Sequence, residues 1–192
     1  MDLTVVTGVP GVGASRVCRE ARSRLGEGYE LLNFGDVMLE RAASRGLVGS
    51  RDDLATLSRR ETRLLQRRAA EYVGDRARGR AVLLDTHLAV ATVHGYLPGL
   101  PAAALADVDP DRFVLVEADP ATVAERRETV GTREYRESGP RSIDLHQDLN
   151  RAAAMGYALE TGAPVRLVEN EGDPETAGER LAGLVERGDR SR

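Results

Sequence analysis

The sequence Gly8-Val9-Pro10-Gly11-Val12-Gly13-Ala14-Ser15 stands between two segments of different hydrophobic periodicity. The run before it, residues 3–7, is apolar and rich in β-branched side chains, which is typical of a buried strand. In residues 15–25 apolar and small side chains recur at helical spacing. A glycine-rich turn between a strand and a helix lets successive backbone N–H groups converge on an anion. Gly8 to Ser15 are therefore a candidate phosphate-binding loop.

The loop fits the pattern G-x-x-x-x-G-K-S/T except that Ala14 stands at the lysine position. Ser15 is placed to bind Mg²⁺ through its hydroxyl. Arg16 is the cation next in sequence, but each residue of a helix is rotated by about 100° from the one before it. The Arg16 side chain can therefore point away from the lysine position. Backbone donors, Mg²⁺ and distant arginines are therefore alternative carriers of the missing charge. Two other interpretations stay open: a glycine-rich turn without a ligand, and a dinucleotide-binding loop, whose G-x-G-x-x-G order does not fit.

The composition of the 192 residues excludes several classes of protein. The net charge of −4 does not favour a general nucleic-acid binder or a polybasic membrane anchor. Cys18 is the single cysteine, which excludes an intrachain disulfide framework and a multi-cysteine metal site. No apolar window approaches about 18 residues, so we expect no membrane span and a cytoplasmic location. All 27 basic residues are arginines, so lysine is absent from any catalytic site.

Strands and helices are predicted to alternate along the rest of the chain. Apolar runs predict strands at residues 29–33, 81–84, 112–117 and 164–168. Helices are predicted at 34–45, 58–78 (opened by a Ser58/Glu61 capping box), 119–128, 142–161 and 173–187. The prolines and glycines of residues 95–101 predict an ordered loop without regular structure, and the polar residues 129–141 predict another loop. The fold class is therefore α/β, with a five-stranded parallel sheet between two helical layers.

Acidic and basic side chains at two further places suit phosphate chemistry. Asp85 ends the third strand, where a Walker-B aspartate holds Mg²⁺ directly or through water; the alternative is an aspartate that caps a loop. Guanidinium groups match the geometry and charge of a phosphoryl transition state. The alternative is that these arginines form ordinary surface ion pairs with nearby acidic residues. The arginines that cluster here are Arg126, Arg127, Arg133, Arg136, Arg141 and Arg151.

Seven segments, in order, resemble the archaeal adenylate kinase family, a trimeric branch of the P-loop nucleoside monophosphate kinases. They are VVTGVPGVG (5–13), LLNFGDVM (31–38), SRDDL (50–54), LLDTH (83–87), GYLPGLP (95–101), LVEADP (115–120) and NRAAAMGYALETGA (150–163). The resemblance covers nearly the whole chain. It implies one P-loop kinase domain with a helical AMP-side insert at about 34–79 and a short lid at about 127–142. It also implies a homotrimer, whereas the expectation of no nucleic-acid or membrane partner comes from the charge and composition.

The resemblance implies reversible, Mg²⁺-dependent phosphoryl transfer from ATP to AMP, which gives two ADP and balances the adenine nucleotides. The residues implied to bind the ATP phosphates are Gly8, Val9, Pro10, Gly11, Val12, Gly13, Ala14, Ser15 and Arg16. Those implied on the AMP side are Asn33, Phe34, Gly35, Arg51, Asp52 and His87. The expected catalytic residues are Arg126, Arg133, Arg136 and Asp85, with Ser15 and Asp85 on Mg²⁺. The lid departs from the family pattern T-R-x-R-D, because residues 132–137 read TREYRE.

Several alternatives stay open at this stage. His87 is placed to donate a hydrogen bond to a phosphate or to orient Asp85. The alternative is a histidine whose hydrogen bonds only stabilise the loop. His94 and His146 are expected to be structural, and three scattered histidines with one cysteine do not predict a transition-metal site. The rival functions are a kinase for another nucleoside monophosphate and a nucleotide-responsive adaptor or assembly factor with slow ATPase activity.

Overall fold

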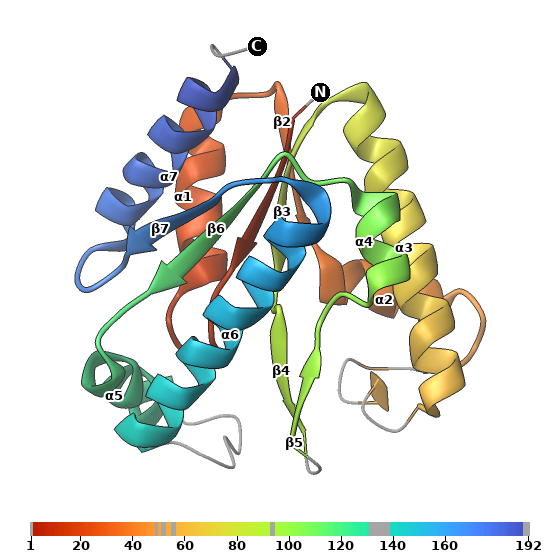
Figure 1. The fold of residues 1–192 in the computed structure, drawn as a ribbon, viewed down its shortest axis with the longest axis horizontal. Helices are drawn as coiled ribbons and strands as arrows, with labels where there is room; N and C mark the ends of the chain where they lie inside the picture. Colours follow the sequence, from red (N-terminus) through yellow and green to blue (C-terminus); the bar gives the residue numbers. More distant parts are fainter. Residues whose placement is uncertain are drawn as a thin grey trace.

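A five-stranded parallel sheet forms the centre of the molecule. The computed structural model describes residues 2–48, 50, 53–54, 57–92, 95–130 and 139–189. The strands are β2 (Tyr29–Asn33), β3 (Ala81–Thr86), β1 (Leu3–Thr7), β6 (Arg112–Glu117) and β7 (Val165–Glu169), in that spatial order (Figure 1). Every neighbouring pair is parallel. The predicted five-stranded parallel sheet is confirmed.

Helices cover both faces of this sheet. On one face α1 (Ala14–Leu25) packs against α7 (Pro174–Asp189), and α5 (Pro120–Val130) adds Val123 to the same core. The other face is covered by α2 (Phe34–Ala43), α3 (Arg59–Gly79), α4 (Ala102–Val108) and α6 (Pro140–Thr161). Successive strand residues point to opposite faces, so Val5 lies in one core and Val6 in the other. The three-layer α/β/α arrangement is therefore confirmed.

The helix boundaries follow the expected capping signals closely. At the start of α3 the Ser58 side chain accepts a hydrogen bond from the backbone N–H of Glu61, and the Glu61 carboxylate accepts one from the backbone N–H of Ser58. The predicted capping box is therefore present. Helix α6 begins at Pro140, two residues before the prediction, because proline suits the first helical position. Gly162 ends α6 with a left-handed backbone, φ 74°.

The prediction that residues 95–101 lack regular structure is wrong. Residues Gly95–Pro98 form β5, which pairs antiparallel with β4 (Ala89–Thr92) as a small hairpin. Both strands of a two-stranded hairpin are edges, so Pro98 is tolerated there although it has no N–H to donate. The short helix α4, which follows Pro101 as its N-cap, was also not predicted.

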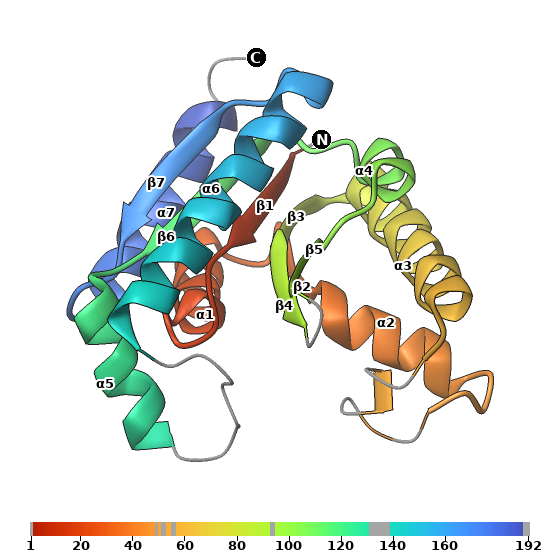
Figure 2. The ribbon, with the colours of Figure 1, turned by 60° about the horizontal axis from the view of Figure 1, so that its bottom comes forward.

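The carboxyl ends of the parallel strands define the edge of the sheet that carries the candidate site. The turn between β1 and α1 lies at this edge, as do α5, the start of α6 and the β4–β5 hairpin (Figure 2). Open parallel sheets bind ligands at this edge, because helix N-termini and loops gather there. Among the described helices, none combines the length and the apolar character needed to span a membrane.

Candidate functional site

The phosphate-binding loop has the backbone that its glycines allow. Gly11 and Gly13 both have φ +89°, in the left-handed region that side chains with a Cβ disfavour. Gly13 is also the N-cap of α1, and its carbonyl accepts hydrogen bonds from the N–H groups of Arg16 and Val17, each at 3.0 Å. A Cβ on Gly8 would lie 2.8 Å from the Val116 carbonyl oxygen. The loop therefore packs tightly against β6.

Side chains from elsewhere in the chain hold the loop's carbonyl groups. Asn170 Nδ2 donates to the Val12 carbonyl at 2.7 Å, and an Arg126 guanidinium N–H donates to the same oxygen at 3.3 Å. His87 Nδ1 lies 2.7 Å from the Gly8 carbonyl oxygen, which only accepts, so Nδ1 carries the proton. This bond goes to the loop and not to Asp85. In a trans peptide the N–H points away from the C=O of the same peptide unit. Because these side chains hold the loop's carbonyls on the outside, the N–H groups of the same peptide units face the inside of the loop, where an anion would bind.

Arg127 is the most buried of the arginines that hold the loop. Its Nε donates to the Pro10 carbonyl at 2.8 Å, and the residue is 7% exposed. A Cβ on Gly11 would lie 2.7 Å from Arg127 Cγ, so Gly11 also makes room for this side chain. Arg127 belongs to the arginine cluster of the sequence but was not among the expected catalytic residues. Its spacing from the buried Val123, one helical turn earlier, is the signal that places it on the inner face of α5.

Ser15, Asp85 and Asn33 meet at the carboxyl end of β3. Asp85 Oδ2 accepts from Ser15 Oγ at 2.6 Å and from Asn33 Nδ2 at 2.9 Å. The carboxylate is 4% exposed, whereas the Ser15 residue is exposed. A hydroxyl and a carboxylate are the oxygen donors that Mg²⁺ prefers, so the pair fits this ion. Within the described residues no three His, Cys, Asp or Glu side chains form a metal site.

The other predicted site residues lie at varied depths. Ala14 is buried against the core, and the Arg16 side chain is exposed on α1. Phe34, the first residue of α2, is 3% exposed and packs in the core between this helix and the sheet, and Gly35 follows it in the first turn. The remaining four, Arg51, Asp52, Arg133 and Arg136, lie outside the described residues.

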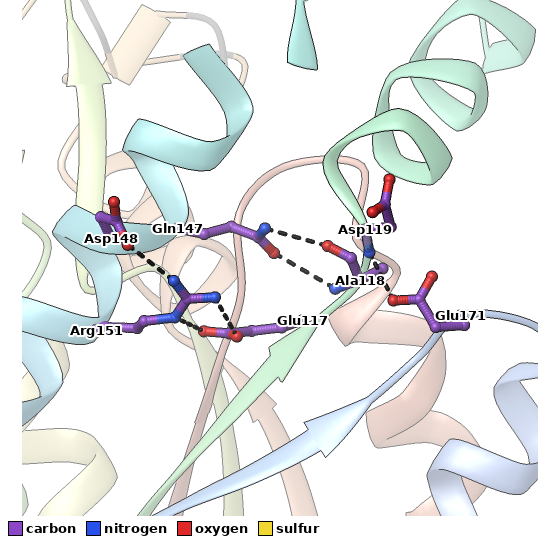
Figure 3. A network of polar contacts seen from close by, with 7 residues as sticks. All are labelled: Glu117, Ala118, Asp119, Gln147, Asp148, Arg151 and Glu171. Carbon is purple, nitrogen blue, oxygen red and sulfur yellow. Dashed lines mark hydrogen bonds and ion pairs between the residues drawn. The ribbon is translucent and has the colours of Figure 1, made fainter. Parts of the chain in front are cut away.

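Helix α6 is fastened to the end of β6 by a polar network that the sequence did not reveal (Figure 3). Gln147 Nε2 donates to the Ala118 carbonyl at 3.1 Å, and Gln147 Oε1 accepts from the Ala118 N–H at 3.4 Å. Arg151 donates to both carboxylate oxygens of Glu117, at 2.8 and 2.7 Å, and the pKa of Arg151 is raised chiefly by these bonds. The network ties α6 to the end of β6, directly before α5.

The same helix also reaches the hairpin and the end of β1. His146 Nε2 lies 2.9 Å from the Ala89 carbonyl oxygen, and the His146 ring packs at 4.8 Å from the Tyr96 ring. Thr7 Oγ1 donates to Asn150 Oδ1 at 3.0 Å. Helix α6 therefore positions the hairpin, the end of β6 and the entry to the phosphate-binding loop relative to one another.

Comparisons with known proteins agree with this arrangement. The AAA domain family matches residues 7–144. An adenylate kinase from Methanothermobacter thermautotrophicus is 41% identical over 187 residues, which cover 97% of this chain and 100% of that protein. An adenylate kinase from Methanopyrus kandleri is 45% identical over 171 residues, which cover 88% of this chain and 89% of that protein.

A solved structure supports the fold independently. A sugar kinase from a Janibacter species superposes with a TM-score of 0.54 at 18% identity, covering 97% of this chain and 95% of that one. This likeness bears on the fold alone. The identities to the two adenylate kinases, together with the phosphate-binding loop and the strand-end Asp85, establish the relationship. The chain belongs to the archaeal adenylate kinase family of P-loop kinases.

Proposed function

We propose that this protein is an adenylate kinase, which transfers the γ-phosphoryl group of ATP to AMP reversibly and thereby balances the adenine nucleotides. The observation that carries the proposal is the loop from Gly8 to Ser15, with its carbonyls held by side chains beside the Ser15–Asp85 pair. Relatives named adenylate kinase at 41% and 45% identity support the choice of reaction.

On the ATP side, backbone N–H groups of the loop bind the phosphate oxygens. Ala14 supplies no positive charge where the P-loop pattern has lysine. Arg126 and Arg127 donate to carbonyls of the loop, so they lie on the side of the loop opposite to its phosphate-binding N–H groups. These two arginines therefore hold the loop in shape. We assign the charge of the missing lysine to the backbone N–H groups and to Mg²⁺.

The metal side of the site is formed by Ser15 and Asp85. Mg²⁺ bound there, directly or through water, would neutralise charge on the phosphate oxygens. Asp85 is held in place by its neighbours on β2 and α1, so its carboxylate needs little rearrangement to serve this role.

On the acceptor side, AMP lies against the start of α2, near Asn33, Phe34 and Gly35, with Arg51, Asp52 and His87 as further contacts. The attacking AMP phosphate oxygen is already ionised near neutral pH, so the reaction needs no strong base. Catalysis then depends on positioning, on charge and on exclusion of water when the lid at about 127–142, with Arg133 and Arg136, closes. The insert at about 34–79, a trimeric assembly and a cytoplasmic location complete the proposal.

A coupled assay with Mg-ATP and each of AMP, GMP, CMP and UMP tests this function. We expect ADP formation with AMP, and its loss in both Ser15→Ala and Asp85→Ala. A preference for another nucleoside monophosphate would leave the assignment as a kinase in place and change only the acceptor substrate. Slow ATP loss that is indifferent to every acceptor would refute the kinase assignment and favour an adaptor with ATPase activity.

A further inference from the structure

Asn33, the last residue of β2, uses both ends of its side-chain amide. Its Nδ2 donates to Asp85 Oδ2 at 2.9 Å, and its Oδ1 accepts from the backbone N–H of Asp36 at 3.1 Å. The second bond makes Asn33 the N-cap of α2. One side chain therefore contacts both the carboxylate of the proposed metal site and the first turn of the helix on the acceptor side.

The sheet register creates this arrangement. Strands β2 and β3 are parallel neighbours, and Asn33 pairs directly with Asp85. Residues that pair in this way project to the same face of the sheet, so the two side chains meet at its carboxyl edge. Asp85 is 4% exposed, and a buried carboxylate needs donors to offset the loss of water. Asn33 and Ser15 supply two donors to the same oxygen.

We infer that Asn33 is a positioning residue that orients the Asp85 carboxylate for the metal ion and couples it to the first turn of α2. This inference rests on the proposed function. Ser15 is itself a proposed metal ligand, whereas Asn33 contacts Asp85 without being one. The Asn33 amide is a donor that metal binding leaves in place. A side chain that orients a metal ligand from behind commonly contributes about 10–100-fold to metal affinity.

Two substitutions separate the two bonds of Asn33. Serine is as good an N-cap as asparagine, so Asn33→Ser keeps the helix cap and removes the amide that reaches Asp85. Asn33→Ala removes both. Ser58→Ala is the matched control, because it removes the N-cap of α3, whose partner is Glu61 and not Asp85.

Titration calorimetry with ATP, with and without Mg²⁺ and without AMP, measures the predicted effect in the absence of turnover. The wild-type protein should bind ATP more tightly when Mg²⁺ is present. Asn33→Ser should lose about tenfold or more of this gain and keep its Mg²⁺-free affinity for ATP. Asn33→Ala should show the same loss with lower stability to urea. The control Ser58→Ala should lose stability and keep the gain.

A full Mg²⁺-dependent gain in Asn33→Ser would refute the inference and leave Asn33 as a helix cap only. A wild-type protein without any such gain would refute it as well, because there would be no metal site to position. Neither outcome depends on phosphoryl transfer. Failure of the proposed function would instead appear as wild-type protein that makes no ADP from AMP.

Discussion

Replacement of Gly13 by alanine should destabilise the protein through two separate effects. Gly13 has φ 89° and ψ 15°, and a residue with a Cβ in this left-handed conformation costs about 1–2 kcal/mol. The new Cβ would also lie 2.7 Å from Asn170 Nδ2, whose side chain must then move. That movement breaks the buried bond to the Val12 carbonyl, which costs about 1–3 kcal/mol when the partners stay unpaired. The expected loss is about 2–5 kcal/mol in total.

Gly162→Ala is the matched control for this prediction. Gly162 has φ 74° and ψ 0°, so alanine meets the same backbone penalty, but its new Cβ would have no heavy atom of the described residues within 4 Å beyond its chain neighbours. Its expected loss is therefore about 1–2 kcal/mol. Urea unfolding measures both values, and an unchanged m-value shows that the difference lies in stability. Equal losses for the two variants would refute the reasoning, because contact with Asn170 would then contribute nothing.

Three further predictions concern other parts of the structure. Gln147→Ala should cost about 1–3 kcal/mol in urea unfolding, because both backbone groups of Ala118 lose their partner. Arg127→Ala should cost about 1.5–3 kcal/mol in urea unfolding, because a charged donor to the Pro10 carbonyl is lost, whereas Arg24→Ala, at an exposed position of α1, should cost less than about 0.5 kcal/mol. Glu61→Ala should destabilise the protein more at pH 7 than at pH 3. Hydrogen bonds from the N-cap serine lower the pKa of Glu61, so the stabilisation is present above the unfolded-state pKa and is lost as the pH falls through the folded one. A loss that does not change with pH would contradict this reasoning.

The sequence predicted the central sheet because its signals are local. Each strand is a short apolar run, and each following helix has its own periodicity and caps, so no distant contact is needed to recognise them. The capping box at Ser58 is such a signal, and the structure has it in full. The phosphate-binding loop was found in the same way, from glycines at fixed spacing between a strand and a helix.

Tertiary contacts account for what the sequence did not predict. The β4–β5 hairpin contains the residues that normally interrupt strands, and its position depends on contacts with α6 through His146. The bonds of Arg127 to the loop and of Gln147 to Ala118 join residues that lie 117 and 29 positions apart. The spacing of Arg127 from the buried Val123 indicates the inner face of α5, but it does not identify the Pro10 carbonyl as the partner.

The fate of the γ-phosphoryl group of ATP tests the central claim most directly. Protein supplied with ATP labelled in this group, Mg²⁺ and AMP should place the label in the β position of newly formed ADP. Two ADP should appear for each ATP and AMP consumed, and little label should appear as inorganic phosphate. Label that appears as inorganic phosphate at the same rate with and without AMP would contradict the account, because the protein would then hydrolyse ATP without transferring its phosphoryl group.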